Sequence, residues 1–406
     1  MRWDRARRVA GAAPAALPAE TRTLADAAGR ALAAPLTALT DLPAFDTSAM
    51  DGWAVAGPGP WTLREDDIAV GRVPAALLPG TAGRIATGAP VPHGAWAVLR
   101  LEDGLVADGV LHAAFPLSQG RDIRPRGGEC IAGTVLVEAG ATVTPALLGL
   151  AAAAGHDGLR VHRHPAVRVL VTGDELLRSG IPADGMVRDA LGPLLVPWLT
   201  AAGASLDGTT PLSDDPAALR SQLRECRADV IITTGSTSVG PTDLLHRLLP
   251  EEGARFLVDS VAVRPGHPML LAALPPATVP ASTGPASTGP ASTGPASTGQ
   301  SRWLVGLPGN PFAAVAGLVT LVLPLLRCLG GHRPPEPLCL PAAAPFPGHP
   351  ADVCLVPAAL SLGRLRPLPF DGPSMLRGIA LAGFLAVVPP GGVAEGAPVE
   401  AIPFGG

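Results

Sequence analysis

The chain has 406 residues, and a chain of this length usually forms about three or four domains rather than one core. Hydrophobic residues make up 47% and charged residues 16%, which excludes overall intrinsic disorder. All 30 basic residues are arginine, and the chain has 34 acidic residues. The resulting net charge of −4 gives no overall positive field that would attract nucleic acid or anionic lipid.

The first 155 residues indicate a small β-rich domain flanked on both sides by helical segments. Residues 1–42 and 121–155 are rich in alanine or other apolar residues at helical spacing, and we expect them to form a helical linker domain. Between them, residues 43–120 contain short apolar runs broken by glycine and proline, which is typical of short strands. Residues 1–20 lack the continuous apolar core of a secretory signal.

Residues 156–331 have the pattern of a doubly wound α/β domain. The segments 167–173 (VRVLVTG) and 229–235 (DVIITTG) are continuous apolar runs that end in glycine, as parallel strands buried on both faces do. Residues 186–202 and 216–226 lie between them with helical periodicity. In such a sheet, ligands bind at the carboxyl ends of the strands.

The rest of the chain predicts a second small β domain and a flexible insert. Residues 334–406 contain short strand-like runs and are expected to form a C-terminal β-barrel-like domain. Residues 280–299 are four tandem Pro-Ala-Ser-Thr-Gly repeats, a composition that cannot bury apolar surface, so we expect a disordered insert that function can spare. It separates 269–274 from 302–307, two strand candidates that could pair as a hairpin.

Two further features indicate a cytoplasmic protein without a membrane span. The five cysteines are scattered, odd in number and lack metal-ligand spacing, which favours reduced thiols. The most apolar stretch, 312–326, is shorter than the roughly 20 residues of a membrane helix and contains Pro324, so we expect a buried helix.

The loop 233–243 (TTGSTSVGPTD) joins a buried strand to a helical segment and is the main candidate binding site. Small residues let backbone N–H groups approach a ligand, and the start of the following helix favours an anion. Asp243 either holds a metal that bridges phosphate oxygens or caps the helix. The residues expected to contact the ligand are Gly235, Ser236, Thr237, Ser238 and Gly240.

Acidic side chains follow the other long strand and should open onto the same edge of the sheet. Asp174 and Glu175, in TGDEL, are candidate magnesium ligands, and Asp174 is alternatively a helix cap. Asp214 and Asp215, in LSDDP, face the same choice, and capping of the helix from Pro216 is the favoured role there.

Two more loops carry candidate anion-binding groups. The segment 306–311 (GLPGNP) joins a strand to a helix, with Asn310 as the cap, and Pro308, Gly309 and Asn310 form a second candidate anion site. The segment 264–268 (RPGHP) contributes the guanidinium of Arg264 and the imidazole of His267, which is alternatively a turn residue.

The β-rich zone supplies weaker candidates. Asp51 lies in a glycine-containing turn of FDTSAMDGWAV, Thr87 in the loop ATGAPVP, and Glu129 beside two arginines in RPRGGE. His162 and His164 alternate along a strand, but the sequence places no third ligand near them, which argues against a metal pair.

Together and in this order, these segments resemble the molybdopterin molybdenumtransferases of the MoeA and gephyrin E-domain type. The match runs from Phe45 to the helix after Pro311 and covers most of the chain, with a weaker match at 372–383 (GPSMLRGIALAG). The matching segments are TSAMDGWAV, IATGAPVP, IRPRGGECIAG, VLVTGDEL, SDDPAAL, ITTGSTSVGPTD, VAVRPGHP and VGLPGNP.

The resemblance implies an elongated homodimer whose central α/β domain is MogA-like, with a cleft between that domain of one subunit and the small β domain of the other. It implies a Mg²⁺-dependent enzyme that cleaves AMP from adenylylated molybdopterin and inserts molybdate. Asp51, Thr87, Glu175 and Asp243 would be catalytic, and the loop 235–240 would cradle the pterin phosphate. The acids of the metal site would be Glu175, Asp243, Asp214 and Glu129. Candidate protein partners are the molybdopterin adenylyltransferase and molybdoenzyme chaperones.

Departures from the family pattern leave two other functions open. The phosphate loop usually reads GGVSVG, so Ser236 stands where glycine is typical. Arg264 and His267 replace the lysines of a KPGKP segment, and a third lysine is replaced near Ser260. One alternative is a non-catalytic carrier or scaffold that binds molybdopterin. The other is a molybdopterin adenylyltransferase, although such enzymes resemble residues 156–331 alone.

Overall fold

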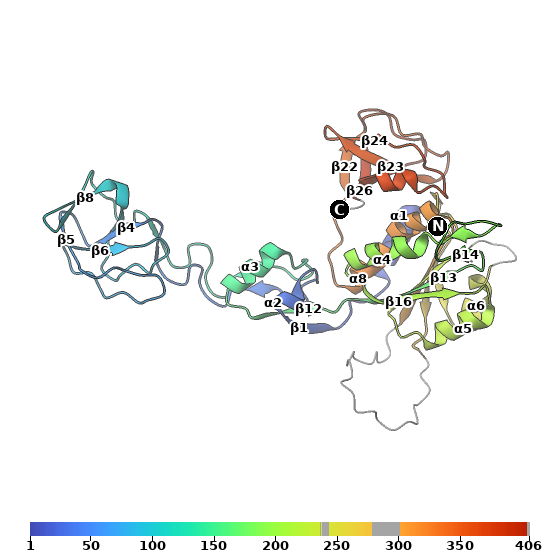
Figure 1. Ribbon diagram of the computed structural model, residues 1–406, viewed down its shortest axis with the longest axis horizontal. Coiled ribbons are helices and arrows are strands. Elements are labelled where there is room, and N and C mark those ends of the chain that lie inside the picture. The colour runs from blue at the N-terminus through green and yellow to red at the C-terminus, as the bar shows by residue number, and fades with distance from the viewer. Residues whose placement is uncertain (236, 238–242, 278–300, 404–406) are drawn as a thin grey trace, which may run out of the picture. The chain divides into compact units, whose positions relative to one another are not determined.

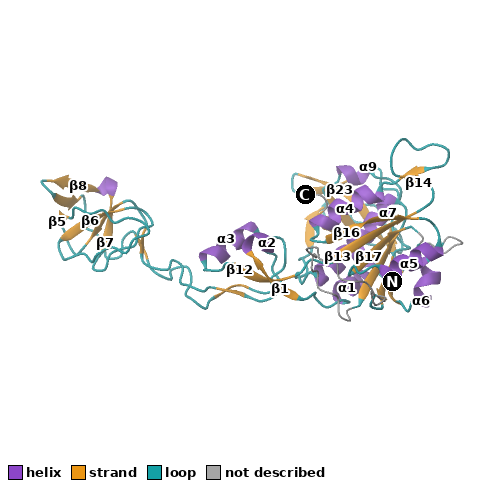
Figure 2. Cartoon of the chain, turned by 60° about the horizontal axis from the view of Figure 1, so that its bottom comes forward, coloured by secondary structure: helices purple, strands orange, loops and turns teal. Residues whose placement is uncertain are grey.

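The computed structural model describes residues 1–235, 237, 243–277 and 301–403, and the chain divides into two units. One unit contains Met1–Glu20 and His162–Gly406, and the other contains Thr21–Val161. Both can be followed along the chain in Figure 1 and by secondary structure in Figure 2.

A six-stranded sheet forms the centre of the first unit, with strand order β16-β13-β17-β21-β20-β18. The first four strands are parallel. The strand β20 is antiparallel to both of its neighbours, so β18 runs in the same direction as the first four. The parallel strands expected at 167–173 and 229–235 are confirmed, and so is the hairpin of 269–274 with 302–307. The strands are β13 (Ala166–Thr172), β16 (Ser205–Leu212), β17 (Val230–Thr234), β18 (Arg255–Asp259), β20 (Leu270–Leu274) and β21 (Arg302–Leu307).

Helices cover both faces of this sheet because alternate strand residues point to opposite sides. Leu170, Ile231 and Leu304 face the side covered by α5 (Pro216–Glu225) and α6 (Leu245–Glu251). The other face packs against α1 (Trp3–Ala12), α4 (Leu191–Ala201) and α7 (Pro311–Gly317). Figure 1 shows α5 and α6 together on one side of the sheet and α1 and α4 on the other.

The helix α7 continues through the π-helical η2 (Leu318–Val322) into α8 (Leu323–Leu329), so the expected buried helix extends further at both ends than 312–326. The whole segment has 19 residues and is long and apolar enough to cross a membrane, but 78% of its most apolar window is buried inside the protein. Trp3 Nε1 donates to Thr320 Oγ1 at 3.1 Å within this packing. The segment therefore has the burial of a core helix.

The C-terminal part of the first unit is a second sheet with the order β19-β23-β25-β26-β22, and β24 pairs with β23. Its edge strand β19 comes from the segment before β20, and it pairs with β23 in parallel. The elements are β19 (Val263–Arg264), β22 (Leu338–Pro341), β23 (Val353–Ser361), β24 (Arg364–Pro367), α9 (Arg377–Leu381), β25 (Phe384–Val388) and β26 (Pro398–Pro403). A separate cluster that includes Phe346, Leu365 and Val388 forms its core.

The second unit contains another six-stranded sheet, with the order β7-β4-β6-β5-β9-β8. Its strands are β4 (Gly52–Val55), β5 (Trp61–Leu63), β6 (Thr81–Ile85), β7 (Ala97–Arg100), β8 (Gly104–Ala107) and β9 (Val110–Ala113). Its other elements are α2 (Leu24–Ala27), β2 (Leu36–Thr37), β3 (Thr47–Ser48), η1 (Leu101–Asp103), β10 (Ile123–Arg124), β11 (Val135–Val137) and α3 (Pro145–Ala153). The strands β1 (Ala19–Thr23) and β12 (Gly158–His162) lie where the chain enters and leaves it.

The division of the chain differs from the one expected for residues 1–42. The helix α1 groups with the first unit, because Trp3, Ala6 and Ala10 are buried in the core of that unit. Residues 21–42 and 121–155 contain short strands in addition to α2 and α3. Two further short strands, β14 (Leu176–Leu177) and β15 (Val187–Arg188), pair in the loop after β13.

Candidate functional site

The carboxyl ends of three neighbouring strands, β13, β17 and β21, converge at one edge of the central sheet. The N–H of Gly235, after β17, donates to Leu307 O of β21 at 2.8 Å. A Cβ on Gly235 would lie 3.1 Å from Thr172 Oγ1 at the end of β13. A Cβ on Gly309 would lie 3.7 Å from Gly235 Cα, so these two expected site residues are close together. Gly235 has φ +85°, a left-handed conformation that glycine adopts at little cost.

Only part of the candidate loop after β17 is described. Ser236, Ser238 and Gly240 lie outside the described residues. Thr237 is 3% exposed and packs over β21, because a Cβ on Gly306 would lie 2.9 Å from Thr237 Cγ2. The same hypothetical Cβ would lie 2.9 Å from Leu245 Cδ1, so glycine at 306 lets both the loop and α6 approach the sheet.

Asp243 is positioned at the start of α6 and is only 7% exposed. Its Oδ1 accepts from the backbone N–H of His246 at 3.1 Å, so the expected capping contact is present. The ring Nδ1 of His246 lies 2.8 Å from Asp243 Oδ2, as an ion pair without hydrogen-bond geometry. The ring Nε2 lies 2.8 Å from Oδ1 of Asp259, at the end of β18. A carboxylate, an imidazole and a second carboxylate therefore stand in a row.

The two carboxylates raise the pKa of His246. Partial burial lowers its pKa, but the contacts with Asp259 and Asp243 outweigh this effect and leave the pKa above its usual value. Neither His246 nor Asp259 is among the site residues expected from the sequence. The three-residue spacing of Asp243 and His246 at a helix start was an available signal for His246. Asp259 lies beside His246 only because of the fold.

The acids after β13 and before α5 are exposed. Glu175 folds back over Gly173, where a Cβ would lie 2.7 Å from Glu175 Oε2, and both Asp174 and Glu175 face solvent. Asp174 caps no helix, because the next helix, α4, receives its cap from Asp189, whose Oδ1 accepts from Leu191 N at 2.9 Å. Asp215 Oδ1 accepts from Ala217 N at 3.0 Å and caps α5, which confirms the favoured role at that position, while Asp214 is exposed.

The start of α7 is covered by the C-terminal part of the chain. The N–H groups of Phe312 and Ala313 donate to Pro373 O at 2.9 and 3.2 Å. Asn310 makes no side-chain cap, and its Oδ1 instead accepts from Ser374 Oγ at 2.7 Å. Two of the N–H donors expected to serve an anion at this helix start are therefore already used.

The loop of Arg264 and His267 packs against the same helix. A Cβ on Gly266 would lie 3.0 Å from Ala313 O, so only glycine allows this approach. Arg264 Nε donates to Asp352 Oδ2 of the C-terminal sheet at 2.9 Å, and the Arg264 side chain is 61% exposed. His267 is exposed as well. The guanidinium is thus held at one nitrogen and open at the surface.

The expected metal acids do not form a ready-made site. Within the described ranges, no group of three His, Cys, Asp or Glu side chains is arranged to hold a metal. Glu129 belongs to the second unit, whereas Glu175, Asp214 and Asp243 belong to the first. Carboxylate oxygens are nevertheless the donors that Mg²⁺ prefers, and Mg²⁺ commonly takes one or two protein carboxylates and completes its shell with water and phosphate. Asp243 and Glu175 fit that partial role by their chemistry.

In the second unit, the structure brings Asp51 and Thr87 together. Asp51 Oδ1 accepts from Thr87 N at 2.7 Å, and the hydrogen bonds from the backbone and side chain of Thr87 lower the Asp51 pKa. The following residue must be glycine, because a Cβ on Gly52 would lie 1.9 Å from Leu99 O. Ser48 is fully buried, and its N–H donates to Ala89 O at 3.0 Å, which ties the two loops together.

Glu129 is exposed, and its backbone N–H donates to Leu42 O at 2.9 Å. The neighbouring Arg126 links this segment to the loop before Asp51, since its N–H donates to Asp46 Oδ1 at 2.7 Å. The RPRGGE segment is therefore packed beside the Asp51 loop in the same unit.

The expectation that His162 and His164 have no further candidate ligand nearby needs correction. His332, far along the chain after α8, is close enough for both imidazoles to influence it. The pKa of His332 is lowered from 6.5 to about 4 by burial, by Arg327, and by the imidazoles of His164 and His162. Among the described residues, these histidines do not belong to a group of three side chains that could hold a metal ion.

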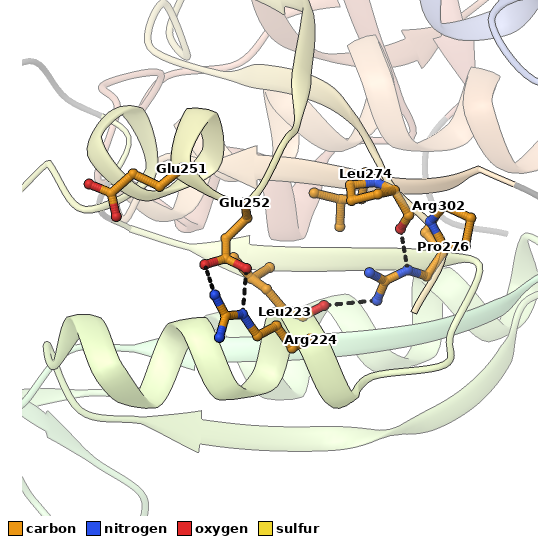
Figure 3. A pocket seen from close by; sticks show the side chains of 8 residues that line it. Leu223, Arg224, Glu251, Glu252, Leu274, Pro276 and Arg302 are labelled. Atoms are coloured by element: carbon orange, nitrogen blue, oxygen red, sulfur yellow. Dashed lines mark hydrogen bonds and ion pairs between the residues drawn. The ribbon is translucent and has the colours of Figure 1, made fainter. Parts of the chain in front are cut away.

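A pocket of about 350 Å³ lies at the opposite edge of the sheet, where β21 begins, and contains none of the expected site residues. Figure 3 shows the buried Arg302 in its wall, which donates to Leu223 O at 2.8 Å and Pro275 O at 3.0 Å. Arg224 and Glu252 form a two-bond ion pair at 2.7 and 2.9 Å beside it. These contacts join α5 and α6 to the strand starts, which is a structural role.

Comparison with known proteins identifies the family. The family described as "MoeA N-terminal region (domain I and II)" matches residues 1–155, and the "Probable molybdopterin binding domain" matches residues 168–328. The chain is 32% identical to molybdopterin molybdenumtransferase 2 of Mycobacterium tuberculosis over 354 residues, 80% of either protein. It is 30% identical to the molybdopterin molybdenumtransferase of Synechococcus elongatus over 352 residues, 80% of this chain and 79% of that protein.

The fold agrees with that result. The crystal structure of a molybdopterin biosynthesis MoeA protein from Pyrococcus horikoshii OT3 superposes with a TM-score of 0.78 at 19% identity, and the match covers 100% of both chains. A second structure of such a protein from Pyrococcus horikoshii gives a TM-score of 0.75 at 22% identity, covering 100% of this chain and 99% of the other. Because of its sequence identity to these two relatives, the chain belongs to the molybdopterin molybdenumtransferase family.

Proposed function

We propose that this chain inserts molybdate into molybdopterin during molybdenum cofactor biosynthesis, and that it releases AMP from the adenylylated form of the pterin. Family membership supports the role in this pathway. The observation that carries the site is the convergence of Gly235, Gly309 and the strand end at Thr172 beside the Asp243 segment. Small residues on adjoining strand ends let backbone N–H groups approach an anion, and both substrates are anions.

The charged residues divide the remaining work. Asp243 and Glu175 would hold Mg²⁺ together with the phosphate oxygens of the substrate. The metal ion, when bound, would neutralise charge that develops on the departing AMP. Arg264 has its Nε fixed by Asp352, and we propose that its terminal nitrogens bind an oxyanion. Ser236 would contribute a hydroxyl where the family usually has glycine.

Asp51 and Thr87 form the second half of the proposed site. The hydrogen bonds from Thr87 lower the pKa of Asp51 and so favour its ionised carboxylate. We propose that the chain acts as a cytoplasmic homodimer in which these two residues serve the strand-end site of the other subunit. Contacts with the molybdopterin adenylyltransferase and with molybdoenzyme chaperones belong to the same proposal.

The test is incubation with adenylylated molybdopterin, Mg²⁺ and molybdate, with AMP release and metal insertion followed together. Wild-type protein should release AMP in step with insertion, and omission of Mg²⁺ should suppress both. Asp243→Ala should lose AMP release but keep its circular dichroism spectrum, while Arg247→Gln, an exposed change on the same helix, should remain active. Binding of the pterin without any AMP release would favour a carrier protein, and ATP-dependent adenylylation would favour the adenylyltransferase.

A further inference from the structure

His246 contacts both oxygens of the Asp243 carboxylate, one through its backbone and one through its ring. The backbone N–H donates to Oδ1 at 3.1 Å, and ring Nδ1 lies 2.8 Å from Oδ2. Asp243 is 7% exposed, and in the part of the chain that the structure describes its carboxylate forms an ion pair only with His246. A carboxylate so removed from water is costly unless it is paired, so the imidazole is its main compensation.

The far side of the ring is fixed by β18. Nε2 lies 2.8 Å from Asp259 Oδ1, and the Asp259 side chain is 56% exposed. The Phe256 ring stacks on the imidazole, with centroids 5.3 Å apart and planes 12° from parallel. These two contacts define the rotation of the His246 ring, and that rotation determines where Nδ1 meets Asp243.

We propose that His246 is a positioning residue for Asp243, with Asp259 as its outer anchor. This role rests on the proposed function, because His246 acts only through the carboxylate that would serve the substrate phosphates. Its ring would keep the Asp243 carboxylate in one orientation between turnovers. Partners that orient a functional carboxylate or metal ligand typically change activity by about 10–100-fold when they are removed.

Two substitutions of His246 separate positioning from packing. His246→Phe keeps a ring that can stack on Phe256 but removes both nitrogens, whereas His246→Asn keeps a donor near the place of Nδ1. We expect kcat for AMP release to fall about 10–100-fold in His246→Phe, with KM for adenylylated molybdopterin changed less than about twofold. His246→Asn should recover most of the loss, and the matched control Arg247→Gln should behave as wild type.

The anchor is tested in protein without substrate. In ¹⁵N-histidine spectra, Asp259→Asn should shift the His246 Nε2 resonance, and the same variant should lower kcat in the direction of His246→Phe. If His246→Phe does not fold, the resonance and kinetics of Asp259→Asn decide. Wild-type kcat in His246→Phe, no recovery in His246→Asn, or an unmoved resonance with wild-type kcat in Asp259→Asn would each overturn the positioning role. Wild-type AMP release in Asp243→Asn would instead refute the proposed function of Asp243, so the two failures are distinguishable.

Discussion

Acid should destabilise the first unit through His332, whose neutral form the fold favours. Its pKa is lowered from 6.5 to about 4 by burial, by Arg327 and by the nearby imidazoles of His164 and His162. Below pH 6.5 the unfolded chain binds a proton that the folded chain does not bind until about pH 4, so stability falls as the pH falls through this window. At about 1.4 kcal/mol per pH unit, and with allowance for partial exposure, His332 accounts for a loss of about 2–3 kcal/mol.

Urea unfolding of wild type and His332→Asn at several pH values, followed by tryptophan fluorescence, measures this contribution. Trp3 and Trp303 are buried in the same unit and report its unfolding. Other titrating groups are shared by the two proteins and cancel in the difference. The free energy of unfolding of wild type relative to the variant should fall by about 2–3 kcal/mol between neutral pH and about pH 4.5. A difference that is independent of pH, or a His332 ring resonance that titrates near 6.5, would refute the reasoning.

Three further substitutions test particular contacts. Gly52→Ala should lower the free energy of unfolding by about 3–5 kcal/mol, because its Cβ would meet Leu99 O at 1.9 Å. The control Gly57→Ala also has a positive φ but open space around it, so it should lower that free energy by about 1 kcal/mol. Thermal and urea unfolding compare the two variants. Asp229→Asn removes the charged partner of Arg163, which it contacts at 2.6 and 2.7 Å, and should lower the free energy of unfolding by about 3–5 kcal/mol. In the same assay, the control Asp4→Asn should lower it by at most about 1 kcal/mol, because the ion pair of Asp4 is exposed. Asp51→Asn should lower AMP release about tenfold or more at unchanged melting temperature, since the exposed carboxylate stabilises little; wild-type turnover in that variant would remove Asp51 from the site.

The sequence predicted those features that depend on local pattern. The apolar runs at 167–173 and 229–235 have the pattern of strands buried on both faces, and the structure has parallel strands there. Their glycine ends are the basis for the position of the proposed site. The hairpin of 269–274 with 302–307 followed from two apolar runs separated by a segment that cannot join a core. The contact of Asp51 with Thr87 could be predicted only from the order of the motifs along the chain.

The missed features depend on contacts between distant segments. Nothing in the sequence near Arg264 indicates that Asp352 holds it, because the pairing of β19 with β23 brings them together. The same is true of Pro373, which covers the start of α7, and of His332, whose pKa is influenced by His162 at the end of β12 and by His164 just after it. His246 lacked any signal stronger than a three-residue spacing, and its second partner, Asp259, is supplied by the neighbouring strand.

The hairpin of β20 and β21 has a practical consequence. In the register of the two strands, Leu274 is opposite Arg302, so the chain leaves and re-enters the sheet at adjacent points. These points lie at the edge opposite the carboxyl ends of β13, β17 and β21. The closure cost of a connection grows by only about 0.6 kcal/mol per doubling of its length. A fluorescent protein or an affinity module whose termini lie close together can therefore replace the native connection, which would give a labelled protein with the strand ends of the proposed site undisturbed.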